Sequence, residues 1–456
     1  MSLILIMAVA HKLGPELMGI YAFGVAFVGI FQIFVNFGLE PFIQREVGRC
    51  PDIAGRLMAQ IFLLKMIIYL ATCILVLIFS LAAVDSELKR QVVWILTGAM
   101  FFQTNFMATN AFFRAFQKAK YEALVRISLR LVYTSLGIVA ILSGRGLLTL
   151  VTLQIIAQAG ACLLAWSLFV KRISNPFQAV SLNHLKKLIQ SVKDFFLIRI
   201  VQTVFNSIDL IMLSLMAGDT ATGFYSVAVR LTGSFGFLPS VFTGAFLPVI
   251  SRQAKTDQNA FVDTFKPYFK YLFIIGLSLA IVLSVLSEKW IVLLFGTSFK
   301  PARPTLVALA IALMITFANW SISNAIVALD KEKAMLKVFS LCAGFNILLN
   351  LLLIPKFQHN GAAWATVASQ ILLLLLQLAT LGKNLLDRLT LGWLSVKPLL
   401  AGVITCGLAW WLVRGHVNLF VGVVLIGLGF LTMLFITRSI TFVELNQARD
   451  LLRLRR

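Results

Sequence analysis

The sequence has little charge, and acidic residues are its scarcest component. Only 13% of its 456 residues are charged, and 18 Asp and Glu stand against 40 Lys and Arg, which gives a formal net charge of +22. A soluble domain carries about 25% charged residues. Because 60% of the residues are hydrophobic, too few charged side chains are left to cover a surface in water. The composition predicts a polytopic membrane protein.

Cysteine and histidine are also scarce. The five cysteines and four histidines are scattered along the chain, without the CxxC or Cys/His spacing of a disulfide framework or a zinc site. Nucleophile elbows, P-loops and paired catalytic carboxylates are missing as well. We therefore expect no metal, no cofactor and no enzymatic activity.

Long apolar runs divide the chain into membrane spans. A spanning helix needs about 20 residues. The first run, 1–10, is about half of that length, so we expect the front of a first helix to be missing. Full-length runs follow at 17–38, 58–84, 92–113, 122–143, 147–170, 195–217, 222–248, 268–287, 303–328, 334–355, 361–382, 396–413 and 418–437. Together they predict an all-α protein of fourteen helices, the first one truncated.

The loops between these runs alternate in basic charge. By our count, roughly 27 of the 40 Lys and Arg lie in loops on one side, and about 9 lie in the opposite loops, Lys89 among them. Basic loops face the cytoplasm, so the first side and the C-terminal tail are predicted to be cytoplasmic. The excess of positive charge is then explained by topology, and no nucleic-acid partner is needed.

The chain contains an internal repeat. The stretch Gly14-Pro-Glu-Leu-Met-Gly19-Ile-Tyr21 is matched by Gly218-Asp-Thr-Ala-Thr-Gly223-Phe-Tyr225. Two further matches follow in the same order: Pro41 to Arg45 with Pro248 to Arg252, and Asn110-Ala111 with Asn324-Ala325. Six helices separate the copies, so both have the same orientation in the membrane. We therefore predict two six-helix lobes as parallel repeats, with a binding site between them.

These patterns divide the chain into four parts. We predict an N-terminal six-helix lobe at 1–172, a C-terminal six-helix lobe at 195–385, and two additional helices with a cytoplasmic tail at 386–456. The joint at 173–194 has apolar residues at helical spacing among lysines, which predicts a cytoplasmic amphipathic helix. It is interpreted either as a plain linker or as a surface for anionic lipid.

The most polar membrane segment is 193–230. Its polar side chains are spaced i, i+3, i+7 and i+10, which places them on one helix face: Arg199, Gln202, Asn206 and Asp209. Arg230 follows on the next helix. Charges at membrane depth normally face a bundle interior or a watery cavity. Two interpretations stay open: the wall of a polar cavity, or an Arg–Asp pair that only pins helices together.

Other spans carry polar stripes. In the first half these are Gln32, Asn36 and Glu40; Gln103, Asn110 and Arg114; and Glu122, Arg126 and Arg130. The outer part of the last stripe is expected to be a salt-bridge ladder, with Arg130 about two turns deeper. Lys65 is expected to reach the cytoplasmic end of its helix by snorkelling. In the second half we expect interhelical hydrogen bonds from Asn319, Ser323, Asn346 and Asn350.

The sign of the deep charges points to the substrate. Arg130, Arg199 and Arg230 outnumber Asp209. A guanidinium group stays charged when desolvated and pairs bidentately with phosphate. A cavity with surplus arginine suits an anionic substrate, whereas an antiporter of cationic drugs would need an excess of carboxylates.

Two stretches carry a family resemblance. KLGPELMGIYAFG with the following NFGLEPFIQREVGR, and NSIDLIMLSLMAGDTATGFYSVAVRL, resemble Wzx-type polysaccharide and O-antigen flippases of the multidrug/oligosaccharidyl-lipid/polysaccharide exporter superfamily. The resemblance covers nearly the whole chain, and the family's plan of six plus six plus two helices matches the predicted spans. It implies two lobes that rock around a central cationic cavity.

The resemblance also implies a function. A flippase of this family moves an undecaprenyl-diphosphate-linked oligosaccharide across the bacterial inner membrane, for exopolysaccharide or lipopolysaccharide synthesis. Arg130, Arg199, Arg230, Gln202 and Asn206 would bind the substrate. Asp209 and Arg230 would form a gating or coupling pair, driven by a proton or a sodium ion. Membrane lipids, a polysaccharide polymerase and glycosyltransferases are the further partners that it implies.

Two other functions compete with this one. The same fold would serve a cation-coupled antiporter of small molecules. A membrane-embedded glycan polymerase is the third possibility, although such enzymes generally carry a long outward loop with functional residues, and the outward loops near 84–91 and 288–302 are short.

Overall fold

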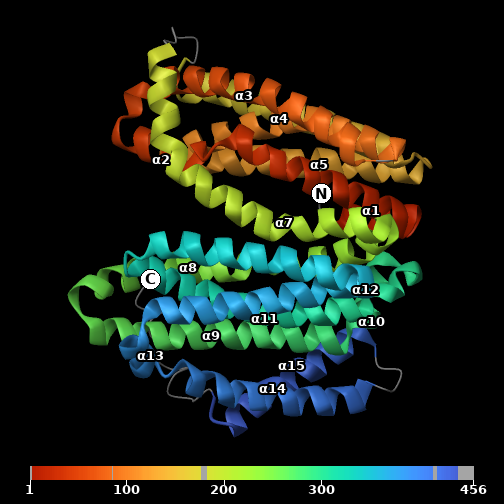
Figure 1. Cartoon of the computed structure of the whole chain (residues 1–456), viewed down its shortest axis with the longest axis vertical. Helices are drawn as coiled ribbons and strands as arrows, with labels where there is room; N and C mark the ends of the chain where they lie inside the picture. The colour runs from red at the N-terminus through yellow and green to blue at the C-terminus, as the bar shows by residue number, and fades with distance from the viewer. Residues whose placement is uncertain (1–2, 85, 176–181, 414–417, 440–456) are drawn as a thin grey trace. The chain divides into compact units, whose positions relative to one another are not determined.

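The structure is all-helical, as the sequence predicts. The computed structural model describes residues 3–84, 86–175, 182–413 and 418–439, and every element in these ranges is a helix (Figure 1). The α-helices are α1 (Leu3–Asn36), α2 (Leu39–Arg49), α3 (Ala54–Ala83), α4 (Glu87–Ala115), α5 (Ala119–Leu142), α6 (Leu147–Arg172), α7 (Leu182–Gly233), α8 (Phe237–Thr256), α9 (Gln258–Val285), α10 (Ser287–Phe295), α11 (Arg303–Ala328), α12 (Glu332–Leu381), α13 (Lys383–Leu389), α14 (Leu391–Val413) and α15 (Leu419–Ile436). Short 3₁₀ turns lie at Pro51–Ile53 and Thr297–Ala302.

Three helices are longer than a single membrane crossing requires. A single crossing takes about 20 residues, whereas α1, α7 and α12 have 34, 52 and 50 residues. Each contains one residue with a non-helical backbone, respectively Gly14, Gly218 and Gln358. The helix is kinked at that residue. Helix α12 holds the predicted segments 334–355 and, except for its last residue, 361–382. Helix α1 holds most of the short first run and of 17–38, and α7 holds 195–217 and the first half of 222–248.

The predicted spans agree with the helices. Within the described ranges, ten helical stretches are long and apolar enough to cross a membrane. Three of them, with 46, 57 and 50 residues, have the length of two crossings. The prediction of an all-α polytopic membrane protein is confirmed, and its count of fourteen crossings is approximate.

The chain forms two compact units, Met1–Ser226 and Val227–Arg456. The boundary lies within α7, after the break at Gly218. The predicted boundaries of the lobes and of the linker, at 172, 194 and 385, stay predictions, because packing divides the chain at a different place and the linker lies partly outside the described residues.

Helix α4 is the centre of the first unit. It packs against α6, α1, α2 and α3. Aromatic and β-branched side chains such as Phe23, Val92, Val93 and Val151 form the core between α1, α4 and α6. In the second unit α11 has this role, since it packs against α9, α12 and α8. The last two helices, α14 and α15, pack against α9 and each other, as expected for an addition to the repeat.

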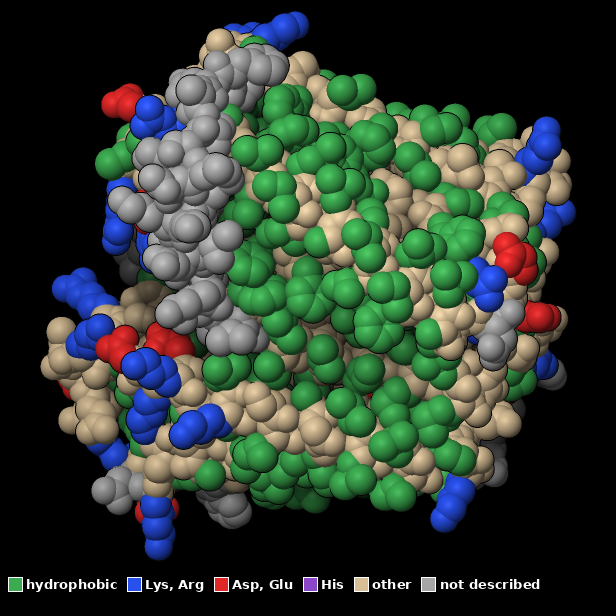
Figure 2. Space-filling view, turned by 45° about the horizontal axis from the view of Figure 1, so that its top comes forward, with side chains coloured by type: hydrophobic (Ala, Val, Ile, Leu, Met, Phe, Trp, Pro, Cys, Tyr) green, Lys and Arg blue, Asp and Glu red, His purple; other side chains and the backbone are tan. Residues whose placement is uncertain are grey.

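The outward faces of the helices are apolar. On α3, large side chains at helical spacing are half or more exposed: Ile67, Leu70, Ile74, Ile78 and Leu81. Figure 2 shows hydrophobic side chains over much of the face in view, with Lys and Arg gathered mainly toward its margins. Soluble proteins rarely expose an apolar surface of this extent to water. It suits contact with lipid.

The internal repeat is visible in the backbone. Gly14 has φ 76° and ψ −178°, and its counterpart Gly218 has φ 85° and ψ 177°. A side chain is disfavoured at such positive φ, which explains the glycine in each copy. The two copies break their long helices by the same backbone conformation.

A second pair of counterparts lies where α4 and α11 end. Gln117 and Asp330 both have φ 56°, and the next residue in each copy is a lysine. Lys118 Nζ donates to the carbonyl of Arg172 at 2.7 Å, and Lys331 Nζ donates to that of Thr380 at 2.9 Å. In each copy a lysine thus caps the end of the copy's last helix, where free carbonyls need donors.

Two glycines bring the copies into backbone contact within the first unit. A Cβ on Gly19 would lie 1.8 Å from the carbonyl oxygen of Asp219, and one on Gly223 would lie 1.9 Å from that of Pro15. Gly19 and Gly223 are counterparts in the repeat, and so are Pro15 and Asp219. The contact is therefore symmetric, and only glycine fits at either position.

We expect Gly19→Ala and Gly223→Ala to destabilise the protein, because a methyl group would push against backbone that cannot rotate away. Overpacking of this kind costs about 1–3 kcal/mol. The melting temperature of the purified protein in detergent measures the effect. Gly160→Ala is the matched control, since nothing lies within 4 Å of its Cβ position. Equal melting temperatures for all three variants would contradict the close contact.

Candidate functional site

The residues of the predicted polar face of α7 differ in burial and in hydrogen bonding. Asp209 is 7% exposed and accepts a hydrogen bond from the hydroxyl of Tyr225 at 2.9 Å. Gln202 is half-buried, and Asn206 is exposed, with its amide donating to the carbonyl of Gln202 at 2.7 Å. The backbone of Arg199 belongs to α7, but its side chain lies outside the described residues. The Asp209–Tyr225 bond links the two parts of α7 across Gly218.

The other two predicted arginines differ in burial. Arg130 is exposed on α5, and Arg230 is half-buried near the end of α7, in the second unit. Their joint role in one cationic cavity stays a prediction, as does the pairing of Asp209 with Arg230.

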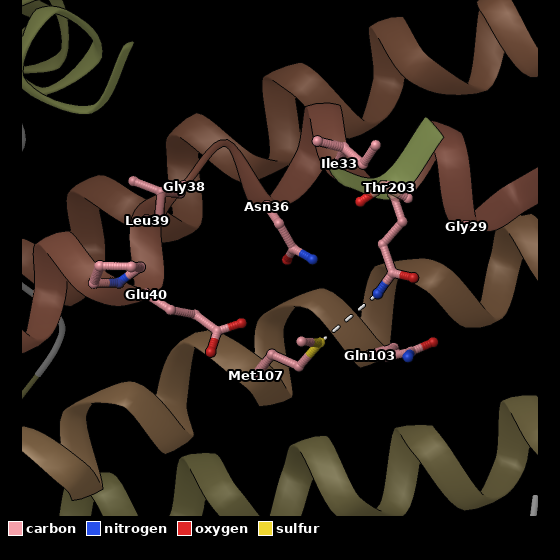
Figure 3. A pocket seen from close by; sticks show the side chains of 11 residues that line it. Gly29, Ile33, Asn36, Gly38, Leu39, Glu40, Gln103, Met107 and Thr203 are labelled. Atoms are coloured by element: carbon pink, nitrogen blue, oxygen red, sulfur yellow. Dashed lines mark hydrogen bonds between the residues drawn. The ribbon is translucent and has the colours of Figure 1, made fainter. Parts of the chain in front are cut away.

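A cavity of about 420 Å³ lies within the first unit (Figure 3). Its walls come from α1, α2, α4 and α7, and they include Gln32, Asn36, Glu40, Gln103, Met107 and Thr203. The sequence signal for this cavity is the polar stripe Gln32, Asn36 and Glu40, which lies outside the predicted binding residues. What the stripe could not show is that α4 completes the wall.

Polar groups point into this cavity. Figure 3 shows the Glu40 carboxylate and the Asn36 amide directed toward its centre. The Gln32 amide donates to Met107 Sδ at 3.7 Å, and Gln158 Nε2 donates to Gln103 Oε1 at 3.3 Å. The cavity thus offers amides and one carboxylate among apolar side chains.

Lys65 lies beside this cavity and is fully buried. Its side chain is 1% exposed, and its ammonium donates to the carbonyl of Thr104 at 2.5 Å and to Asn36 Oδ1 at 3.4 Å. The expectation that Lys65 snorkels to the cytoplasmic end is wrong. Acceptors on α1 and α4 are within its reach inside the bundle, so the ammonium is solvated by protein and not by water.

An ion network closes one end of α4. Arg114 bridges Glu40 and Glu122 at 2.7 Å each, and Arg126 contacts Glu122 at 2.7 Å. The salt-bridge ladder expected on α5 is confirmed, and it extends through Arg114 to α2. These groups are only partly exposed, so the network fixes the positions of three helices.

A second charge cluster lies at the other end of α4. Lys89 pairs with Asp219 at 2.6 Å, Ser214 donates to the same carboxylate at 2.8 Å, and the Lys89 ammonium lies 5.0 Å from the centre of the Phe23 ring. Lys89 is only 8% exposed, although the sequence placed it in a loop. The cluster adjoins the glycine contact, since Gly19 packs against the backbone carbonyl of Asp219 itself. Sequence reasoning missed it because the partners are 130 residues apart.

The second unit has a neutral polar cluster. Thr243 Oγ1 accepts from Trp320 Nε1 at 3.0 Å and from Asn324 Nδ2 at 2.9 Å, and Asn324 also donates to the hydroxyl of Tyr268 at 2.7 Å. The expected interhelical bonds of Asn319 and Ser323 are confirmed, with partners Gln370 and Gln377 on α12. Asn350 donates to Asn346 within α12. In the described part of the chain, no group of three or more His, Cys, Asp or Glu side chains could bind a metal ion together.

Removing Arg114 should destabilise the first unit. Arg114→Ala would leave Glu40 and Glu122 without their shared partner, and an unpaired, largely buried group costs about 1–3 kcal/mol. The exposed pair Arg45–Glu46 is the control, because Arg45→Ala should cost less than about 1 kcal/mol. Melting temperatures measure both. If Arg45→Ala lowers stability as much as Arg114→Ala, the network has no special role.

The chain is similar to a polysaccharide biosynthesis family and to proteins named as probable flippases. Residues 1–253 match the family described as polysaccharide biosynthesis protein. The chain is 30% identical over 175 residues to the "Probable flippase AglR" of Haloferax volcanii, across 36% of this chain and 35% of that one. It therefore spans about a third of that relative. It is 20% identical to the "Probable low-salt glycan biosynthesis flippase Agl15" of the same organism, across 79% of this chain and 75% of that one.

Solved structures show the same fold. The lipid II flippase MurJ, in an inward closed conformation, superimposes with a TM-score of 0.77 at 16% identity, over 97% of this chain and 96% of that one. An inward-facing MATE multidrug resistance transporter of the MOP superfamily superimposes with a TM-score of 0.70 at 17% identity, over 85% and 94% of the two chains. Such identities support the fold and leave the substrate to other arguments.

Proposed function

Because this chain belongs to the polysaccharide biosynthesis protein family, we propose that it is a flippase for undecaprenyl-diphosphate-linked oligosaccharides that serve surface polysaccharide synthesis. It is a multi-pass membrane protein with the fold of MOP-superfamily flippases and transporters. The observation that carries the proposal is the family match joined to a flippase fold over nearly the whole chain. Under this proposal the protein lies in the bacterial inner membrane, with its C-terminus in the cytoplasm.

The proposed substrate is a diphosphate with a sugar on one side and a long lipid on the other. Arg130, Arg199 and Arg230 would bind the diphosphate, because guanidinium groups pair bidentately with phosphate oxygens. Gln202 and Asn206 would donate to and accept from sugar hydroxyls. The lipid chain would stay in the bilayer, against the apolar helix faces.

The transport cycle requires the two predicted lobes to change their contact. The symmetric contact of Gly19 and Gly223 and the ion pair Lys89–Asp219 join helices of the two predicted lobes. Under the proposal both separate when the opposite side of the protein closes. Asp209 and Arg230 would form the pair that senses this change. A proton or sodium ion would bias the equilibrium between the states, and a polysaccharide polymerase and glycosyltransferases would work beside the flippase.

An antiporter of small molecules is the second candidate. The likeness to a MATE multidrug transporter favours it, whereas the surplus of arginine disfavours cationic drugs. The flippase relatives favour a transporter without catalytic activity over a glycan polymerase. Drug resistance on overexpression, with unchanged surface polysaccharide in a deletion strain, would decide for the antiporter.

We expect Arg199→Ala and Arg230→Ala each to abolish surface polysaccharide in a complemented deletion strain, because the diphosphate would lose its partners. Protein level should stay normal, as judged by immunoblotting of membranes. Arg252→Ala is the control, since Arg252 is an exposed arginine outside the predicted site and should retain full polysaccharide. Unchanged polysaccharide in both site variants would refute the binding assignment.

The ion pair Lys89–Asp219 gives a second test of the cycle. Lys89→Asp should lower polysaccharide several-fold, because two carboxylates would then repel each other where the helices meet. The double variant Lys89→Asp with Asp219→Lys should recover most of it by restoring the pair in reverse. A double variant no better than the single one would show that the contact has no role in transport.

A further inference from the structure

A hinge separates the first two helices. Helix α1 ends at Asn36 and α2 begins at Leu39. Between them Phe37 has φ 45° and Gly38 has φ 66°. A bulky residue in this left-handed region costs of order 1–3 kcal/mol and persists only when its surroundings hold it there. The backbone is therefore strained at Phe37, whereas Gly38 adopts its positive φ freely, and the contacts of the neighbouring residues hold Phe37 in this conformation.

Lys65 is the side chain that holds this hinge from α3. Its ammonium donates to Asn36 Oδ1, on the last residue of α1, and to the carbonyl of Thr104 on α4. Within the described part of the chain, no carboxylate forms an ion pair with it. The titratable groups that interact with it electrostatically are Glu40 on α2 and Cys162 on α6. The hinge is thus tied to a buried cation whose direct partners are neutral.

A cavity adjoins this place. Asn36 and Glu40, on the two sides of the hinge, both line the cavity of about 420 Å³. A water molecule takes about 30 Å³ of liquid volume, so several fit. Asn36 is therefore in contact with the cavity and with the Lys65 ammonium at once. Under the proposal, a proton that leaves Lys65 would pass to water in this cavity beside Asn36.

The two protonation states of Lys65 would hold the hinge differently. An ammonium has three donors and no acceptor, and bonds from an ionised donor are about twice as strong as neutral ones. A neutral amine loses one donor and the charge, so its hold on Asn36 and Thr104 weakens. We propose that Lys65 is a proton-carrying residue that couples proton binding to the bend between α1 and α2. Its part in a transport cycle rests on the proposed flippase function.

The second copy of the repeat has a neutral contact at the position where the first copy has Lys65 and the hinge. Thr243 stands five residues before Pro248, as Asn36 stands five before Pro41. Thr243 is bonded to the hydroxyl of Tyr268 on α9, the counterpart of α3. The same place is thus reached by a neutral side chain. Helix α8 also runs through Thr243 and Pro248 without a left-handed residue. At this place, buried charge and hinge occur together in the first copy, and the described residues of α8 and Tyr268 in the second copy show neither.

The test measures the bend without any substrate. Spin labels on Val25→Cys of α1 and on the native Cys50, which follows α2, lie on the two sides of the hinge; both positions are exposed. The full chain, with its four other cysteines replaced by serine, is placed in lipid nanodiscs. The distance distribution is recorded by electron spin resonance from about pH 6 to about pH 10, a range that brackets ordinary and buried lysines.

We expect a shift of the distribution with pH in the parent chain. Lys65→Arg should stay at the low-pH distribution at every pH, because guanidinium does not lose its proton. Lys65→Gln should stay at the high-pH one. Lys171→Gln, the same change at an exposed lysine of the same unit, should keep the shift. A parent chain without a shift, or a Lys65 variant that retains it, overturns the proposal.

Two further variants and readouts complete the test. If the Lys65 variants do not fold, Asn36→Ala removes the acceptor on the hinge and should abolish the shift, and a retained shift overturns the proposal. In cells, Lys65→Arg and Lys65→Gln should lower surface polysaccharide at least about tenfold. Normal polysaccharide in both would overturn the coupling role. The distance measurement is made without glycan substrate. Its outcome is therefore independent of the polysaccharide tests of Arg199 and Arg230.

Discussion

Charged side chains within a membrane bundle must find partners in the protein, and in the first unit α4 provides most of them. Bilayer lipid offers neither hydrogen bonds nor counter-ions, so an unpaired group there costs several kcal/mol. Lys89 at the start of α4 pairs with Asp219. The carbonyl of Thr104 accepts from Lys65, and Arg114 near its end pairs with Glu40 and Glu122. These contacts and the packing around α4 position the neighbouring helices, which are α1, α2, α3, α5 and α7.

The two copies of the repeat satisfy this constraint with different polar groups. Their backbones share the breaks at Gly14 and Gly218 and the left-handed turns at Gln117 and Asp330. Their polar interiors do not match. The first copy holds lysine, arginine and glutamate in networks, whereas Thr243, Tyr268 and Asn324 of the second copy form a neutral cluster. The duplicated backbone geometry thus carries unequal charge in its two copies.

This division suits a flippase. A carrier for a lipid-linked anion needs helices that separate and close again, and a source of energy that biases one state. Under the proposed cycle, the glycine contacts would separate at modest cost because no side chains interlock there, and the neighbouring ion pair Lys89–Asp219 would give the closed state its specificity. The family match and the likeness to flippases are consistent with a molecule built on such a contact.

The sequence alone determined the membrane class, the positions of nearly all helices and the repeat. Hydropathy runs and the glycines at 14 and 218 report on the local chain, and local features survive folding. It did not determine which charges meet. Lys65 was expected at the interface and is buried, Lys89 was placed in a loop and is part of an ion cluster, and Arg130 is exposed. The cavity with Asn36 and Glu40 also needed α4 to complete it. Partners distant in sequence are chosen by packing, because the energy of a buried charge depends on which acceptor the neighbouring helix brings within hydrogen-bond distance.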